Sequence, residues 1–217
     1  MARKSKMNAH LLVEGPNDFH VISHLCQVHK VPETFDILTP PKGGQTAGGD
    51  VQVLRNLRIQ LLAKGKRAIG IVLDADEELA RRWQQLTHII QGFGYTVSPQ
   101  PDPMGTIISG PHAHQPMIGI WLMPNNQTVG NLEDFIRYLI PNDDQLRPYA
   151  DDVLDKIEAA ALNKYGRKRS KAFVHTWLAW QKVPGLPMGT SITTKVLSPN
   201  APLALTFVDW LNRLFNP

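Results

Sequence analysis

The chain has 217 residues, of which 42% are hydrophobic, so it can bury the core of one substantial domain. Its formal net charge of +4 is compatible with a polyanionic partner but too small for histone-like binding to nucleic acid. The single cysteine, Cys26, excludes a disulfide framework and a zinc site built from cysteines, and it favours a reducing, cytoplasmic location. No apolar stretch approaches the about 20 residues of a membrane span or the core of a signal peptide. We therefore expect a soluble protein that does not act in a membrane.

Short apolar runs alternate with helical patterns in the first part of the chain. Strands separated by helices in this way form right-handed βαβ units and a parallel sheet with both faces covered. The expected fold class is therefore α/β, with a mostly parallel sheet flanked by helices. The apolar runs that predict strands are residues 10–15, 35–40 and 67–76, and the patterns that predict helices are residues 16–30, 51–65 and 77–94.

The pattern changes after residue 95. Short strands with Pro- and Gly-rich connections come first, and we expect them to be antiparallel strands at the edge of the sheet. Helical patterns follow from Asn131 onward. We therefore expect a basic N-terminal tail, an α/β core and a helical extension packed on that core, with boundaries at residues 1–9, 10–130 and 131–217. The short strands are predicted at residues 95–100, 106–111 and 118–124, and the helices at residues 131–140, 145–166, 170–183 and 203–215.

Carboxylates stand at the ends of two predicted strands. Glu14 ends the first strand, and Asp74 and Asp76 end the third. Because side chains alternate along a strand, Asp74 and Asp76 should project from the same side. The carboxyl ends of parallel strands meet at one edge of a sheet, so Glu14 should face this pair. Carboxylates so close raise one another's pKa unless a divalent cation neutralises them, and this set, together with Asp18, suits Mg²⁺ or Mn²⁺.

The order of these acids resembles a known family. The first strand ends in Glu-Gly at Glu14, with Asp18 four residues later, and the third strand ends in Asp-x-Asp at Asp74 and Asp76. This pattern resembles the Toprim fold of topoisomerases, bacterial primases, ribosomal-RNA maturation nucleases and overcoming-lysogenization-defect (OLD) nucleases. The resemblance covers residues 10–125 and is closer to small stand-alone Toprim-like proteins of unknown function.

The resemblance implies a role for each of these acids. Glu14 would be the acid, base or ligand in phosphoryl transfer, while Asp74 and Asp76 would hold Mg²⁺. Asp18 would either assist the metal or cap its helix.

Glu133 and Asp134 open the helix predicted after the last strand. Acids in a first turn favour the positive end of the helix dipole, which is one interpretation of both residues. OLD nucleases carry a further acid that contributes to a second metal, and Glu133 lies where that acid would fall. Both interpretations remain open from the sequence.

The Gly-rich segment at residues 41–50 contains Lys42 and four glycines. Its backbone amides, including those of Gly43 and Gly44, could wrap around a phosphate or a metal-bound oxygen. A flexible linker is the other interpretation. The segment is not a P-loop, because GxxxxGK[ST] is absent here and elsewhere in the chain.

A second basic segment precedes and opens one of the C-terminal helices. Lys171 and His175 are four residues apart and share one helical face, directly after Arg167, Lys168 and Arg169. These residues could bind phosphate oxygens of a nucleic acid or stabilise charge that develops in a transition state. A solvated basic start of the helix is the alternative.

Together these features predict a Mg²⁺- or Mn²⁺-dependent phosphoryl-transfer enzyme, a nuclease or phosphodiesterase that acts on nucleic acid. Glu14 would move the proton, and Lys42 or Lys171 would offset charge on the phosphate. The alternative is a non-catalytic Toprim-like module that binds a metal-nucleotide or nucleic acid and acts through a partner, such as a separately encoded ATPase. A small-molecule phosphatase would use the same carboxylates.

Overall fold

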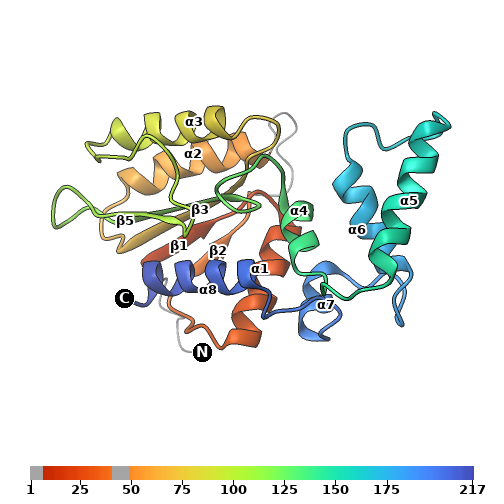
Figure 1. The fold of residues 1–217 in the computed structure, drawn as a ribbon. Helices are drawn as coiled ribbons and strands as arrows, with labels where there is room; N and C mark the ends of the chain where they lie inside the picture. Colours follow the sequence, from red (N-terminus) through yellow and green to blue (C-terminus); the bar gives the residue numbers. More distant parts are fainter. Residues whose placement is uncertain (1–6, 41–48) are drawn as a thin grey trace.

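A five-stranded, mostly parallel sheet forms the centre of an α/β fold (Figure 1). The structure, a computed structural model, describes residues 7–40 and 49–217. The strands are β1 (Ala9–Leu12), β2 (Asp36–Leu38), β3 (Ala68–Asp74), β4 (Thr106–Ile108) and β5 (Met117–Met123). Their order is β2-β1-β3-β5-β4, and every neighbouring pair is parallel except β4 with β5.

Helices lie on both faces of the sheet, which confirms the expected arrangement. Within the described ranges they are α1 (Pro16–His29), α2 (Gly49–Leu62), α3 (Leu79–Gln91), α4 (Leu132–Tyr138), α5 (Leu146–Ala159), α6 (Arg169–Ala179), α7 (Met188–Thr193) and α8 (Pro202–Phe215). Helices α2 and α3 cover one face, and α1 and α8 cover the other (Figure 1). None of these helices is long and apolar enough to span a membrane.

The two faces of the sheet have separate hydrophobic cores because side chains alternate along β3. Ile69, Ile71 and Leu73 are fully buried on the side of α2 and α3. Ala68 and Val72 belong to the other core, which also contains buried residues of α1 and of α4 to α8. The C-terminal helices therefore share a core with one face of the sheet, while a domain boundary near residue 130 stays a prediction.

Three sequence-based predictions differ from the structure. Residues 95–100 form no strand. Strand β5 is an inner strand parallel to β3 over seven residue pairs, and only β4 is an antiparallel edge strand. An inner parallel strand is apolar on both faces, so its orientation cannot be deduced from its side chains alone. The predicted tail at residues 1–9 is also too long, because Ala9 is a fully buried residue of β1 that pairs with Ala68.

A pair of glycines lets α8 pack closely on the sheet. Gly70 of β3 and Gly119 of β5 are paired neighbours. A Cβ atom at Gly119 would overlap the side chain of Leu214 in α8. Leu214 is itself fully buried, so it cannot turn away into solvent.

We expect Gly119→Ala to lower the free energy of unfolding by about 1–3 kcal/mol, because α8 must shift or Leu214 must adopt a strained rotamer. Urea unfolding measures this change. Ala80→Leu adds atoms at an exposed position of α3 and should change the free energy by less than about 0.5 kcal/mol. Equal stability of Gly119→Ala and the wild type would contradict the close packing of α8.

Candidate functional site

Glu14 and Asp74 lie together at the carboxyl edge of the sheet. Glu14 follows β1 by two residues, and Asp74 is the last residue of β3. The Oε1 atom of Glu14 accepts a 2.8 Å hydrogen bond from the backbone amide of Asp74. Gly49, the first residue of α2, packs so closely here that a Cβ atom would lie 2.7 Å from the carbonyl oxygen of Glu14. The structure therefore brings together two of the acids that the sequence placed at neighbouring strand ends.

Two further carboxylates are buried beside this pair. Asp18, in the first turn of α1, is 7% exposed, and Glu133, in the first turn of α4, is 5% exposed. The Nζ atom of Lys171, on α6, forms a 3.0 Å ion pair with Oε1 of Glu133. Both Asp18 and Glu133 repel a negative charge on Asp74. Carboxylates from several elements thus converge here, with Lys171 as a counter-charge.

Burial and mutual repulsion raise the pKa of three of these carboxyl groups. The pKa of Asp74 rises to about 9, first because of burial and then because of the charges of Glu14 and Asp18. Burial also raises the pKa of Glu14 to about 7, although its hydrogen bond from the Asp74 amide acts in the opposite direction. The pKa of Asp18 rises to about 6, again mainly through burial, with a contribution from Glu133. Burial and repulsion therefore favour the protonated form of Asp74 when no metal is bound.

Asp76 has different surroundings from these buried acids. Strand β3 ends at Asp74, and Asp76 has a φ angle of 52°, so the strand alternation that placed both aspartates on one side does not extend to Asp76. Its backbone exchanges two 2.8 Å hydrogen bonds with Gly130. Its Oδ2 atom forms a 2.6 Å ion pair with Nη2 of Arg82. The Asp76 carboxylate is thus held by an arginine.

Arg82 of α3 is a residue of this site that the sequence-based prediction missed. Its side chain is 9% exposed, and its Nη1 atom lies 2.9 Å from Oδ2 of Asp50. Its Nε atom donates a 3.0 Å hydrogen bond to the carbonyl oxygen of Asp74. Helical spacing puts Arg82 on the same face as the buried Leu86 and Ile90. Arg82 could therefore have been recognised in the sequence as a charged residue on the apolar face of a predicted helix.

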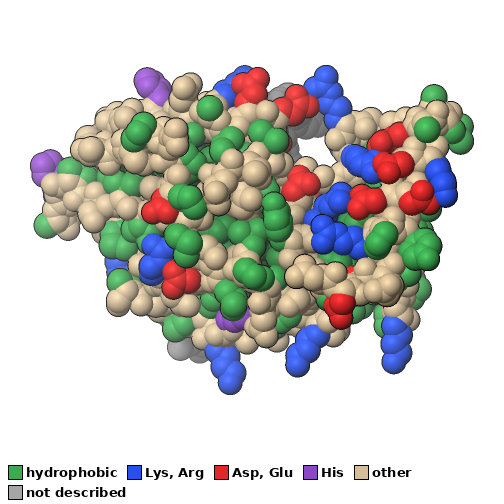
Figure 2. Space-filling model, viewed as in Figure 1, with side chains coloured by type: hydrophobic (Ala, Val, Ile, Leu, Met, Phe, Trp, Pro, Cys, Tyr) green, Lys and Arg blue, Asp and Glu red, His purple; other side chains and the backbone are tan. Residues whose placement is uncertain are grey.

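A cleft of about 680 Å³ opens beside Asp74, between the sheet edge and the start of α6. Figure 2 shows acidic and basic side chains facing each other across a hollow at this place. Arg167 forms a 2.8 Å ion pair with Glu77. The acids that line the cleft are Asp74, Asp76, Glu77, Glu133 and Asp134, and the basic residues are Arg167, Lys168 and Lys171.

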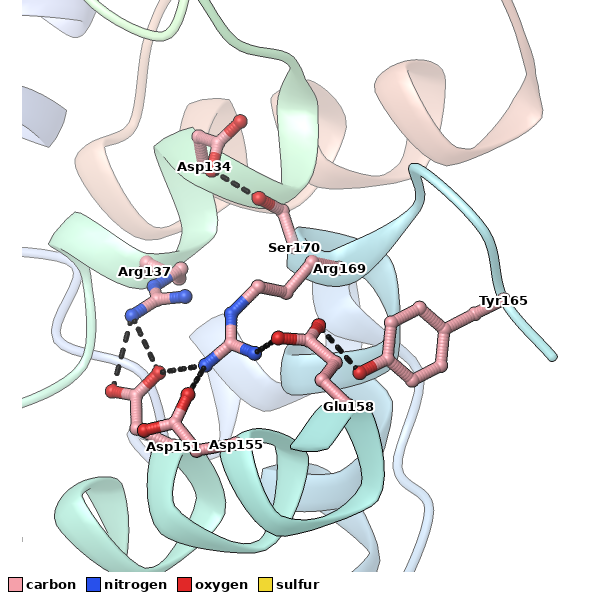
Figure 3. A network of polar contacts seen from close by, with 8 residues as sticks. All are labelled: Asp134, Arg137, Asp151, Asp155, Glu158, Tyr165, Arg169 and Ser170. Carbon is pink, nitrogen blue, oxygen red and sulfur yellow. Dashed lines mark hydrogen bonds and ion pairs between the residues drawn. The ribbon is translucent and has the colours of Figure 1, made fainter. Parts of the chain in front are cut away.

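The two acids at the start of α4 have different roles. Asp134 completes a capping box with Asn131 and accepts a hydrogen bond from Ser170 (Figure 3). Glu133 is buried and paired with Lys171. Asp134 therefore has the structural role of a helix cap, whereas Glu133 belongs to the carboxylate cluster.

Some of the predicted phosphate-binding residues do not line this cleft. Arg169 forms ion pairs of 2.7 Å with Asp155 and 2.5 Å with Glu158, so its charge is neutralised by α5 (Figure 3). His175, which lies one helical turn after Lys171 on α6, is exposed and does not line the cleft. The basic residues that do face the acids are therefore Lys168, Lys171 and the ion-paired Arg167. The predicted residues of the Gly-rich segment, Lys42, Gly43 and Gly44, lie outside the described residues.

The donor atoms of this site fit a hard divalent cation, although the side chains are not arranged around one. Carboxylate oxygens are the ligands that Mg²⁺ and Mn²⁺ prefer, and a cation would stabilise the charged forms of Glu14, Asp18 and Asp74. Within residues 7–40 and 49–217, no three His, Cys, Asp or Glu side chains are grouped as they would be around a metal ion. One carboxylate oxygen of Asp74 accepts a 3.0 Å hydrogen bond from the amide of Leu132, and Asp76 is paired with Arg82. Cation binding therefore requires side-chain rotation.

Similarity to other proteins identifies a family for this chain but no function. No curated protein and no solved structure matches it significantly. The roles of the acids and of the cleft therefore have to be inferred from their own geometry. A family model described as "Protein of unknown function (DUF3226)" matches residues 8–216, nearly the whole chain, and the chain therefore belongs to the DUF3226 family.

Proposed function

We propose that this protein is a Mg²⁺- or Mn²⁺-dependent phosphoryl-transfer enzyme, a nuclease or phosphodiesterase that acts on nucleic acid. The observation that supports it is the convergence of partly buried Glu14 and Asp74 with buried Asp18 and Glu133 at the carboxyl edge of a parallel sheet. Buried like charges are costly for a fold, and groups with strongly shifted pKa values gather at functional sites. A Toprim-like arrangement of the sheet and its acids is part of this proposal, on the basis of the sequence pattern.

The proposed reaction assigns a part to five residues of the site. Asp74 and Glu133, with Asp76 after rotation, would hold the cation. Glu14 has a pKa of about 7, so it can both accept and donate a proton near neutral pH. Lys171 can contact a phosphate oxygen because it is half-exposed in the same cleft. A divalent cation bound here would supply Lewis-acid activation of a phosphate and of a water molecule.

The cleft favours a phosphodiester as the substrate. It is open and about 680 Å³ in volume, and its lining combines basic residues at the start of α6 with several acids. Lys168 and Lys171 can therefore bind backbone phosphates while the acids hold the cation that offsets the remaining repulsion. Binding through these basic residues should weaken as the salt concentration rises, with a shallow slope because few phosphates are contacted, and it should show little base selectivity.

Hydrolysis of labelled DNA and RNA oligonucleotides tests this function. We expect cleavage with Mn²⁺ or Mg²⁺ and none with EDTA. Lys171→Met should lower kcat by about 100-fold, because the transition state loses a charged partner, while Mn²⁺ binding persists. Lys182→Met, at an exposed position after α6, is the matched control and should retain wild-type activity.

Cleavage that persists in EDTA, or that Lys171→Met leaves unchanged, would contradict the proposed reaction. Mn²⁺ binding without cleavage of any substrate would instead favour the non-catalytic module that acts through a partner protein.

A further inference from the structure

Asp76 stands between two hollows of the protein surface. One is the cleft of about 680 Å³ that also contains Asp74 and Lys171. The other, of about 400 Å³, lies on the α3 side and is lined by Arg81 and Arg82 together with Asp76. The Asp76 carboxylate contacts Arg82, and its backbone is fixed by the two hydrogen bonds with Gly130. Only rotation of the side chain can therefore bring this carboxylate toward Asp74.

Arg82 is held in place independently of Asp76. Its Nη1 atom lies 2.9 Å from Asp50 and 3.3 Å from Oε1 of Gln85, and its Nε atom lies 3.0 Å from the carbonyl oxygen of Asp74. The Arg82 side chain is 9% exposed, whereas that of Asp76 is 57% exposed. If this ion pair opens, Asp76 has the freedom to move and Arg82 does not.

The Arg82–Asp76 ion pair relieves repulsion at the acidic site. Asp76 already adds to the repulsion that Glu14 and Asp18 exert on a negative charge at Asp74, and rotation of its side chain toward Asp74 would increase this repulsion. A divalent cation reverses this balance, because it attracts several carboxylates at once and offers Asp76 a more highly charged partner than a guanidinium. The metal-free and metal-bound states thus favour different positions of the Asp76 side chain.

We propose that Arg82 is an internal counter-ion that holds Asp76 away from the acidic site until a divalent cation displaces it. This inference rests on the proposed metal-dependent function and concerns the regulation of the same site. Cation binding must break the Arg82–Asp76 ion pair, so Arg82 weakens the affinity and sets the cation concentration at which the site fills. Arg82 is a positioning residue in this scheme, because it acts through Asp76.

Calorimetric titration with Mn²⁺ tests the inference without relying on activity. Arg82→Gln should bind Mn²⁺ about 3- to 10-fold more tightly than the wild type, because no ion pair has to open. Arg81→Gln is the matched control: Arg81 is exposed and lines the same hollow, so its loss removes one charge without removing the contact to Asp76. This control should change the affinity by less than about 2-fold, because the exposed charge is screened by salt.

A second variant, Arg82→Lys, separates the loss of the contact with Asp76 from the loss of positive charge, and it can replace Arg82→Gln if that variant does not fold. Arg82→Lys keeps the charge but cannot contact Asp50, Asp76 and the Asp74 carbonyl group at the same time, so it should also bind Mn²⁺ more tightly than the wild type. Circular dichroism shows whether each variant is folded. If Arg82→Gln does not fold, Arg82→Lys carries the test.

The double variant Arg82→Gln/Asp76→Asn identifies Asp76 as the residue through which Arg82 acts. In the Asp76→Asn background, Arg82→Gln should give no gain in affinity beyond that of Arg81→Gln. A gain that persists in this background would overturn the inference. If the wild type binds Mn²⁺ and both Arg82 variants bind it equally well or more weakly, the inference is overturned and the proposed function stands. If none of these proteins binds Mn²⁺, both the inference and the proposed function are overturned.

Discussion

Asp74→Asn is expected to lower metal-dependent hydrolysis by about 1,000-fold and to remove most of the Mn²⁺ binding, because a hard anionic ligand is lost. The free energy of unfolding of the metal-free protein should stay the same or increase. Burial and neighbouring acids raise the pKa of Asp74 and favour its neutral form, so asparagine should replace it with little loss of charge. The asparagine oxygen can also accept the hydrogen bond that Leu132 donates to Oδ1 of Asp74. Function and stability should thus respond in different ways.

Two matched variants make this result interpretable. Asp74→Ala also removes the acceptor for Leu132 and should lower the free energy of unfolding by about 1–3 kcal/mol. Asp152→Asn removes only an exposed ion pair with Lys156 on α5, so it should change the free energy of unfolding by less than about 0.5 kcal/mol and leave the metal response unchanged. Thermal melts in EDTA and in millimolar Mg²⁺ or Mn²⁺ measure both properties, because a ligand of the folded state raises the melting temperature. A purely structural Asp74 would show the reverse: a weaker fold in Asp74→Asn with an unchanged metal-dependent shift.

The metal-free protein is expected to lose several kcal/mol of stability as the pH rises from about 5 to about 9. Folding raises the pKa of Asp18 to about 6, of Glu14 to about 7 and of Asp74 to about 9. Between the ordinary carboxyl pKa, near 4, and these raised values, the folded protein binds more protons than the unfolded chain. Raising the pH in this window therefore favours unfolding. Below pH 4 the groups are protonated in both states, and the effect is constant.

Urea unfolding at pH 5, 7 and 9 in EDTA measures this dependence. Millimolar Mg²⁺ should reduce the loss of stability, because the cation stabilises the charged carboxylates of the folded state. Asp74→Asn should remove most of the loss between pH 7 and pH 9, since Asp74 is the carboxyl group with the highest of these pKa values. Stability that rises with pH in EDTA would show that these groups are not held in their neutral form by burial.

Local patterns along the chain were sufficient to predict the α/β class and part of the site. Apolar runs and helical spacing are properties of neighbouring residues, so β1, β3 and the helices that follow them were recognisable. The closeness of Glu14 and Asp74 followed from one rule, that the carboxyl ends of parallel strands meet at the same edge.

Contacts between distant parts of the chain decided the remaining features. The place of β5 beside β3 depends on pairing between residues about 50 positions apart, such as Asp74 with Met123, which no local pattern encodes. The ion pairs of Lys171 with Glu133 and of Arg82 with Asp50 also join distant residues, so no local pattern predicts them. The left-handed backbone at Asp76 is coupled to its bridge with Gly130, so the position of its carboxylate could not be predicted from strand alternation. Residue types and order therefore indicated that acids gather at the carboxyl edge of the sheet. Tertiary packing determined which of these acids are buried, which carry a counter-charge and which one is paired with an arginine, because burial and charge pairing exist only once the distant segments meet.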